Sequence, residues 1–453
     1  LGGAMNLVDD GTLSGTSSIE LSFGNLVLEN QVSLVGLSDR LRDGAPLTLR
    51  GAMLQLVGRS NMPLTETVGA VTLDGGLSSL RVDRQSTGVS GTQLIIDSLS
   101  RSLGSAAMLN VVGGVSGTLG QMGSNPRVLA NSAPTLVSNL VGGWAVAGGA
   151  EFLSYVPGVG FGALNAAGFA GYHANYLPTV SQAGWNVRLA AAATVPAGGV
   201  TLNAVNLAGN FNLAFSNASD VLNVVSGGLM RASNTPNSIG TAVLPGRLTA
   251  GGSAPSGVSD LYLYNNQGTL TVNSLIVDNG GSPLRLVAGS ANGGTTVLAG
   301  ANTFTGGLVA NQGVVQLNLT GANGLTAVAV PVAASGADKT LMVDGGTVQW
   351  MAANQVAFGA VPTLSGSGAL NLNGFDQTLA GLVFTANGGT PPNVLTGAGT
   401  LTLTGDISVT NRSGNPSLAP SLGGKLDLGG GVRVIDVGGM VINGAMDITA
   451  ANP

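Results

Sequence analysis

The 453-residue sequence contains no cysteine and only one histidine, His173. The absence of cysteine excludes disulfide bonds and thiolate metal sites, and it suits a chain that crosses an oxidising compartment unfolded. Charge is also scarce, because Asp, Glu, Lys and Arg together make up 8% of the residues, against roughly 25% in typical soluble proteins. Enzymes depend largely on ionisable side chains, so these absences argue against a catalyst.

Basic residues form no run in the chain, and only two of the sixteen are lysines, Lys339 and Lys425. Together with the net charge of −5, this argues against nucleic-acid binding and against electrostatic docking to a membrane. The neutral run 152–187 contains two prolines and repeated glycines, so we expect no transmembrane span there. The first residues lack the regions of a signal peptide, and we interpret the chain as a fragment of a longer protein.

What the chain does contain is glycine, at 74 positions, and a hydrophobic fraction of 44%, which is ample for a core. Short units of alternating apolar residues recur between glycines, and this period of two predicts short amphipathic strands. The units are GALNLNG (368–374), GTLTLTG (399–405) and GKLDLGG (424–430), with the related pair NNQGTLTVN (265–273) and ANQGVVQLN (310–318). We therefore predict an all-β protein.

A further motif places an acidic residue and a glycine pair at the end of a strand, as in TLDGG from Thr72, MVDGG from Met342 and VDNGG from Val277. Asp or Asn before glycine is typical of turns, because the short side chain bonds its own backbone. The variable spacing of the strand units favours an elongated parallel β-solenoid with loop insertions over a closed barrel, whose strands constrain one another.

The stretch GTTVLAGANTFTGGLVANQGVVQLN (294–318) closely resembles the autotransporter-associated β-strand repeat. Segments 42–58, 66–76, 140–169 and 260–280 are similar to recurrent segments of the very large bacterial surface proteins that carry this repeat. The resemblance implies a right-handed parallel β-helix passenger, exported across an outer membrane and displayed at the cell surface. The repeat is well formed only once here and is degenerate elsewhere, so the export route is an inference.

We divide the chain by composition into three parts. Residues 1–128 are predicted to form a charge-richer β-solenoid, residues 129–188 an aromatic and glycine-rich irregular or inserted segment, and residues 189–453 a second β-solenoid that carries the repeat motif at 294–318.

Aromatic residues are concentrated in the middle segment, where they predict either a contact patch or a place where the core widens. Aromatic rings stack on sugars and anchor protein interfaces, whereas the packing interpretation needs only a local interruption of the strands. The candidate patch consists of Trp144, Phe152, Tyr155, Phe161, Tyr172, Tyr176 and Trp185.

Two further groups of residues have a functional and a structural interpretation. His173 is a candidate general base, with Glu151 as the nearest acid in sequence, but a base of this kind needs an oriented acid and a nucleophile. The first 127 residues hold eight of the sixteen basic and ten of the twenty-one acidic residues. These charges predict a solvated face of balanced ion pairs, with a polar docking face as the alternative.

Parallel β-helices that act on polysaccharides need clustered carboxylates, often with calcium. The only adjacent acidic pair is Asp9–Asp10, and no nucleotide, calcium or zinc motif occurs. We therefore expect no cofactor and no metal. The sequence predicts a non-catalytic extracellular β-solenoid segment of a large bacterial cell-surface protein, in adhesion or surface structure. Expected partners are a glycan or other cell-surface ligand, or a second copy bound through the solenoid ends or flanks. A self-assembling fibre subunit is the alternative, and a β-helix lyase or hydrolase ranks last.

Overall fold

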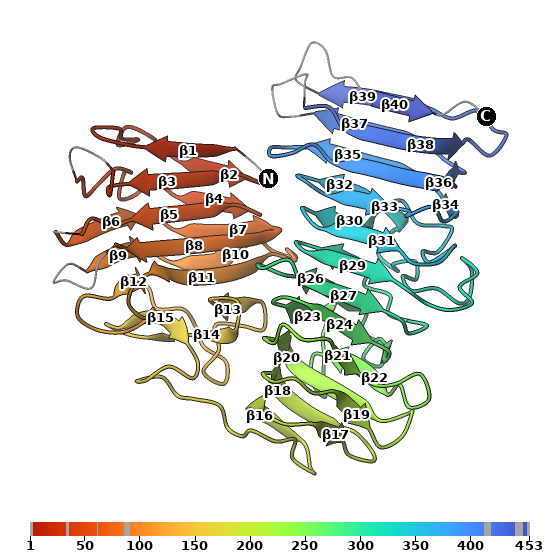
Figure 1. Cartoon of the computed structure of the whole chain (residues 1–453), viewed down its shortest axis with the longest axis horizontal. Coiled ribbons are helices and arrows are strands. Elements are labelled where there is room, and N and C mark those ends of the chain that lie inside the picture. Colours follow the sequence, from red (N-terminus) through yellow and green to blue (C-terminus); the bar gives the residue numbers. More distant parts are fainter. Residues whose placement is uncertain are drawn as a thin grey trace. The chain divides into compact units, whose positions relative to one another are not determined.

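The computed structural model describes residues 3–32, 36–60, 62–85, 91–411, 418–439 and 447–450. Over these residues the regular structure is nearly all strand, and the only helical turn described is η1 (Ala337–Lys339). The predicted all-β class is confirmed (Figure 1). The chain divides into two compact units, Leu1–Tyr172 and His173–Pro453. This boundary falls inside the segment 129–188 that composition had set apart.

The first unit contains three sheets, and consecutive strands of the chain lie in different sheets except for the last three, which share one. The eight-stranded sheet has the order β1 (Ala4–Leu7), β3 (Asn25–Glu29), β5 (Met53–Val57), β8 (Leu77–Arg84), β11 (Met108–Val115), β13 (Ala145–Ala147), β14 (Glu151–Val156) and β15 (Gly160–Ala163). The four-stranded sheet runs β10 (Leu99–Arg101), β7 (Val71–Gly75), β4 (Leu47–Arg50) and β2 (Ile19–Ser22), and the three-stranded sheet runs β12 (Pro126–Ala130), β9 (Thr92–Ile96) and β6 (Leu64–Val68).

Pairing in the first unit is parallel up to β13, but β13 with β14 and β14 with β15 are antiparallel. These antiparallel strands lie in the segment 129–188 that was predicted to be irregular or inserted, outside the two predicted solenoids. The physical reason is local, because tight turns reverse the chain on both sides of β14. Gly148 and Gly149 form the first turn with φ of 59° and 74°, and Gly158 lies in the second with φ of 77°.

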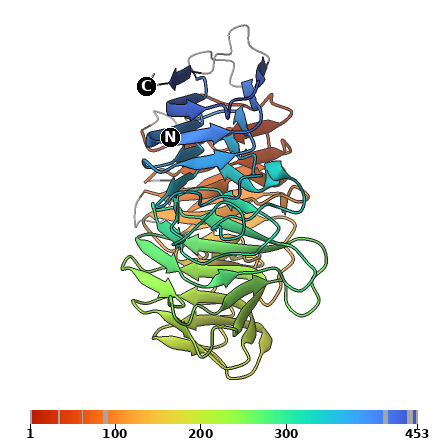
Figure 2. The same ribbon diagram turned by 90° about the vertical axis from the view of Figure 1, so that its right-hand side faces the viewer.

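The second unit has two long sheets (Figures 1 and 2). One sheet has the order β16 (Gln182–Leu189), β18 (Val200–Leu207), β20 (Val221–Arg231), β23 (Ser259–Asn265), β26 (Leu284–Gly289), β28 (Leu308–Ala310), β30 (Leu341–Asp344), β32 (Thr363–Ser365), β35 (Leu382–Ala386), β37 (Ile407–Asn411) and β39 (Ile435–Gly439), and β22 (Arg247–Ala250) and β25 (Leu275–Ile276) branch from it. The other has the order β17 (Ala193–Val195), β19 (Leu213–Phe215), β21 (Asn237–Ile239), β24 (Thr269–Val272), β27 (Thr295–Leu298), β29 (Val314–Leu317), β31 (Thr347–Trp350), β33 (Ala369–Asn371), β36 (Asn393–Leu403), β38 (Ser421–Asp427) and β40 (Asp447–Ala450), with β34 (Gln377–Leu379) beside β36.

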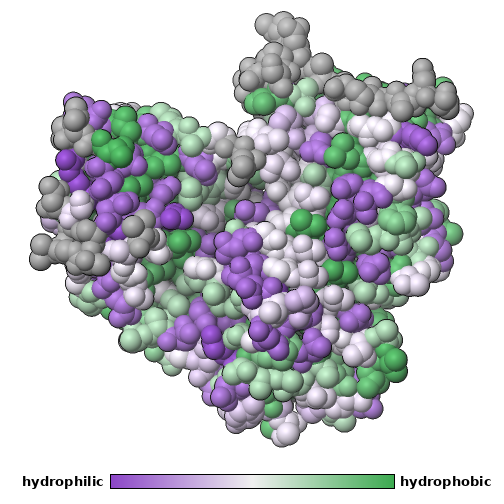
Figure 3. Space-filling model, viewed as in Figure 1, coloured by the Kyte–Doolittle hydropathy of each residue, from purple (hydrophilic) through white to green (hydrophobic). Residues whose placement is uncertain are grey.

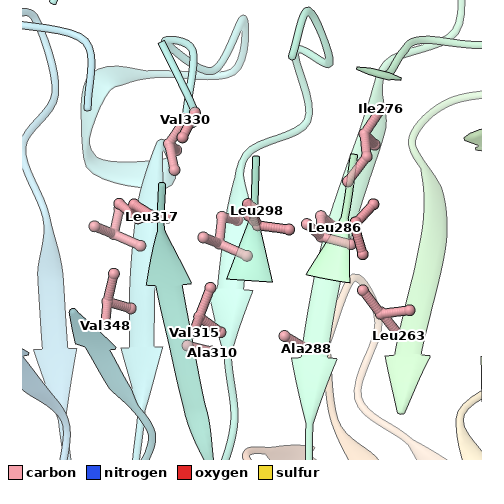
Figure 4. Close-up of a cluster of buried hydrophobic side chains, with 14 of the residues drawn as sticks. Leu263, Ile276, Leu286, Ala288, Leu298, Ala310, Val315, Leu317, Val330 and Val348 are labelled. Carbon is pink, nitrogen blue, oxygen red and sulfur yellow. The ribbon is translucent and has the colours of Figure 1, made fainter. Parts of the chain in front are cut away.

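The core of the second unit consists of aliphatic side chains that point inwards from successive parallel strands. Leu286 pairs with Leu308 and Leu308 with Leu341, and all three are 0% exposed. Figure 4 shows such side chains from neighbouring strands pointing into the space enclosed by the strands. Alternate residues face outwards, as β29 and β31 show with the burial pattern intermediate, buried, intermediate, buried. The period of two in the sequence thus separates the core from the surface.

The repeated units are strands, but their pairing follows similarity only in part. GTLTLTG and GKLDLGG lie side by side, with Leu401 opposite Leu426. GALNLNG does not pair with GTLTLTG, because Ala369 to Asn371 lie opposite Asn393 to Leu395. NNQGTLTVN and ANQGVVQLN are in register with one strand between them, since β27 pairs with β24 on one side and β29 on the other.

The ANTFTGG segment forms hydrogen bonds with parts of the second unit that come before and after it in the chain. Asn302 is 4% exposed; its Oδ1 accepts the N–H of Ile276 (2.9 Å) and its Nδ2 donates to the carbonyl of Ala329 (2.8 Å). The backbone N–H and hydroxyl of Thr305 both donate to the carboxylate of Asp278, at 2.8 and 2.7 Å. At Gly306 a Cβ would lie 2.4 Å from the backbone of Leu284, so only glycine fits there.

Two other buried side-chain amides, further along the chain, also form hydrogen bonds with distant parts of the second unit. Gln355 accepts the N–H of Leu319 and donates back to its carbonyl, at 2.7 and 3.0 Å. Gln377 accepts from the indole N–H of Trp350 (2.9 Å) and from the N–H of Val356 (3.1 Å), and donates to the carbonyl of Val356 (2.9 Å). A neutral amide can both donate and accept a hydrogen bond at one position. The polar groups at these bends therefore have hydrogen-bond partners without a buried charge.

The substitution Asn302→Asp tests this bridging role. It keeps the acceptor for Ile276 but removes the donor to Ala329 and places a carboxylate in a buried site. We expect the free energy of unfolding at pH 7 to fall by about 2–3 kcal/mol, measured by urea denaturation. Asn318→Asp is the matched control, because that side chain is exposed. Equal effects of the two substitutions would contradict a bridging role.

Candidate contact surface

Part of the predicted aromatic patch belongs to the core of the first unit. Phe152 and Phe161 are 0% exposed and Tyr155 is 5% exposed. The rings of Tyr155 and Phe161 meet edge to face at 4.8 Å, and the Tyr155 hydroxyl donates to the carbonyl of Ala130 (2.8 Å). Trp144 is partly buried against the same core, with the guanidinium of Arg101 5.1 Å from its ring centre. For Phe152, Tyr155 and Phe161 the burial favours the packing interpretation.

The remaining three members of the patch are accessible to different extents. Tyr172, in the first unit, is partly buried and donates its hydroxyl proton to Glu151 (2.7 Å). Tyr176 and Trp185 belong to the second unit; Tyr176 is 58% exposed and Trp185 is partly buried. The seven aromatic residues are thus divided between the two units, and Tyr176 is the most exposed of them.

A pair of alanine substitutions separates packing from contact. Phe161→Ala removes a fully buried ring, and we expect it to lower the free energy of unfolding by about 3–5 kcal/mol. Tyr176→Ala removes a mostly exposed ring and should change stability by less than about 0.5 kcal/mol. Thermal and urea unfolding of both variants provide the measurement. A large loss from Tyr176→Ala would show that its ring packs in the native fold.

His173 has structural partners. Its backbone N–H donates to the carbonyl of Asn186 (2.9 Å) and its Nδ1 accepts the N–H of Asn186 (3.1 Å). The imidazole is stacked on the indole of Trp185, with ring centres 6.1 Å apart. Through these contacts the segment beginning at His173 lies along strand β16, where Ala174 bridges Val187. The described contacts account for the orientation of the histidine without a catalytic partner.

The charged residues of the first unit are of two kinds. Arg50 forms an ion pair with Asp74, and both side chains are partly exposed. The Nε of Arg81 lies 2.9 Å from Asp83; the Arg81 side chain is partly exposed, whereas Asp83 is buried. Arg40 and Glu66 are 0% exposed, which the sequence pattern did not reveal. A solvated face therefore describes only some of these charges.

Arg40 and Glu66 hold together segments that are distant in sequence. The two carboxylate oxygens of Glu66 accept the backbone N–H groups of Leu41 (2.8 Å) and Arg40 (2.9 Å). The guanidinium of Arg40 donates to Asn30 Oδ1 and to the carbonyls of Gly11 and Glu29, at distances from 2.8 to 3.2 Å. Burial raises the pKa of Glu66 from 4.5 to about 7, and the two backbone donors oppose this shift only in part.

This raised pKa has a consequence for stability. Between pH 4.5 and about 7 the native state holds a proton on Glu66 that the unfolded chain has released, so this contribution to stability falls as pH rises. We expect the free energy of unfolding to fall by about 3 kcal/mol across this pH window. The substitution Glu66→Gln should remove most of this pH dependence. Urea unfolding at several pH values measures the slope. Glu20→Gln, at an exposed position, should leave the slope in place; a slope unchanged by Glu66→Gln would exclude Glu66 as its source.

A hollow of about 690 Å³ lies on the outer side of the sheet that contains β33, β36 and β38. A register shift forms it: Leu395 pairs with Gly423 and Thr400 with Lys425, so residues 396–399 lie opposite Gly424 alone. Gly424 has a φ of 106°, and a Cβ there would lie 2.1 Å from Thr396 Oγ1. The hollow is lined by Asn371, Asn373, Gly374, Leu395, Gly397, Ala398, Gly423 and Gly424.

Polar and apolar residues are mixed in small patches on the face drawn in Figure 3. Among the described residues no three His, Asp or Glu side chains gather as a metal site would require. No helix in the same part of the chain is long and apolar enough to cross a membrane. Comparisons of the chain with family models, curated proteins and solved structures found no match.

Proposed function

We propose that this chain is a non-catalytic extracellular β-solenoid segment of a large bacterial cell-surface protein, with a role in adhesion or surface structure. The observation that carries the proposal is the order of the strands. In the second unit, β26 to β31 alternate between two sheets, and each pairs in parallel with the strand two places later. Such an order is what coils of a solenoid produce, and parallel crossovers are right-handed in about 98% of cases.

The character of the outward-facing side chains supports a surface role. Along β29, β31 and β33 the outward row is Gln316, Gln349 and Asn371, and the amide of Gln316 donates to that of Gln349 (2.9 Å). These neutral polar groups can bond to a partner without strong electrostatic fields. The resemblance of the segment 294–318 to the autotransporter-associated repeat points to the same class of protein. The scarcity of ionisable residues supports a non-catalytic role.

One observation favours the second candidate, a self-assembling fibre subunit. Strand β1 pairs with β3 on one side, and no partner for its other side is present among the described residues. Met5 on this strand is 52% exposed, and Val8 just after it is 41% exposed. A strand edge with apolar side chains is a template for pairing, either with a further strand of the same protein or with another chain.

Electron microscopy and sedimentation of the purified chain distinguish the two candidates. At micromolar concentration, in low and high salt, a tethered passenger should give discrete particles of one mass. A fibre subunit should give regular filaments that survive high salt, because few charges are involved. Filaments would replace the first candidate with the second.

Adhesion itself requires a separate measurement. Beads coated with the chain should attach to cells or to immobilised glycans more than beads coated with an unrelated acidic β-protein. The attachment should vary little with ionic strength, since the chain carries 8% charged residues. No attachment to any cell or glycan, with discrete particles in the microscope, would contradict adhesion.

A further inference from the structure

We infer that the hollow lined by Asn371, Asn373 and Leu395 binds a neutral oligosaccharide. The inference rests on the proposed adhesive function, and it identifies the site and the chemical class of its ligand. A hollow of about 690 Å³ is within the range of ligand pockets. It lies at the surface, where Asn373, Gly374, Leu395, Gly397 and Ala398 are all exposed, so a ligand can reach it from solvent.

Two amide side chains provide hydrogen-bonding atoms of both kinds. Asn371 Oδ1 accepts the N–H of Asn373 (2.9 Å), which orients the amide. The Nδ2 of Asn373 donates to the carbonyl of Trp350 (3.3 Å). Among the described residues this leaves the Nδ2 of Asn371 as a donor and the Oδ1 of Asn373 as an acceptor without a protein partner. A sugar hydroxyl both donates and accepts, so one saccharide unit can satisfy both atoms.

The rest of the hollow suits the apolar face of a sugar ring. Leu395 is 50% exposed, although Val394 beside it in the chain is fully buried. Its neighbours in the hollow are mainly glycines, which carry no side chain that would keep a flat ring away from the backbone. Burial of the ring's C–H groups against Leu395 then contributes a hydrophobic term.

The charge pattern selects a neutral ligand. No residue that lines the hollow is charged. Lys425 follows Gly424 in the chain and is exposed, but it does not line the hollow. Asp376 accepts the N–H of Thr400 at 2.7 Å, so this carboxylate has a backbone partner. A sulfated or sialylated sugar would therefore find no matched cation inside the hollow, whereas hydroxyl groups find amides.

The test uses the full chain on a glycan array that carries neutral and acidic oligosaccharides, followed by titration of the strongest neutral trisaccharide. Asn371→Asp replaces the open donor with an acceptor and adds a charge, and Leu395→Ala removes the apolar contact. Asn318→Asp is the matched control: it makes the same chemical change at an exposed position, and it lies outside the hollow. Thermal unfolding confirms that each variant is folded.

We expect the wild-type chain to bind neutral glycans, each hollow variant to weaken binding at least tenfold, and Asn318→Asp to change it less than twofold. Neutral binding that survives both hollow variants would overturn this site and leave adhesion standing. Binding of acidic glycans alone would also overturn this site and leave adhesion standing. Binding of no glycan by a chain whose coated beads still attach to cells would overturn the ligand class, whereas loss of all attachment would overturn the proposed function as well.

Discussion

The structure depends on one constraint, the parallel pairing of each strand with its neighbours in the same sheet. Each strand must present apolar residues inwards and polar ones outwards, and each buried bend between strands must satisfy its backbone groups away from water. In this chain buried amides meet the second demand, as Asn302, Gln355 and Gln377 show. Even the buried guanidinium of Arg231 donates to the amide oxygens of Asn237 and Asn265. Because amides carry no charge, they satisfy these bends at a lower cost of desolvation than buried ionisable groups such as Arg40, Glu66 and Arg231.

The sequence predicted those features that depend on local pattern. The strand class followed from alternation, and the turns after Asp74 and Asp344 followed from their glycine pairs. Register did not follow, because degenerate units such as GALNLNG and GTLTLTG fit several alignments equally well. The structure pairs the first with Asn393–Leu395 instead. The antiparallel end of the first unit lies in the segment 129–188 that composition set apart, but its strand direction depends on two short turns that composition did not predict.

The candidate sites, too, could be predicted from the sequence only in part. Aromatic clustering in sequence drew attention to residues 144–185, but it could not show that Phe152 and Phe161 face inwards and Tyr176 outwards. Glu66 contacts backbone groups 25 and 26 residues earlier, so its burial had no local signal. The hollow is made by residues 371–374, 395–398 and 423–424, and it exists only because β36 carries extra residues opposite Gly424. Each feature depends on stacking, which a single strand does not encode.

The unequal length of chain between paired strands has an evolutionary consequence. Leu308 pairs with Leu341 across a segment that includes η1, whereas Leu286 reaches its partner Leu308 through a much shorter connection. Since each strand pairs with its immediate neighbours, a connection can lengthen at the surface without disturbing the pairs above and below. In the proposed solenoid, in-frame duplication of one coil would add a layer to the same core. The gene of such a protein can change the length of its product by whole coils, because each added strand has a neighbour to pair with.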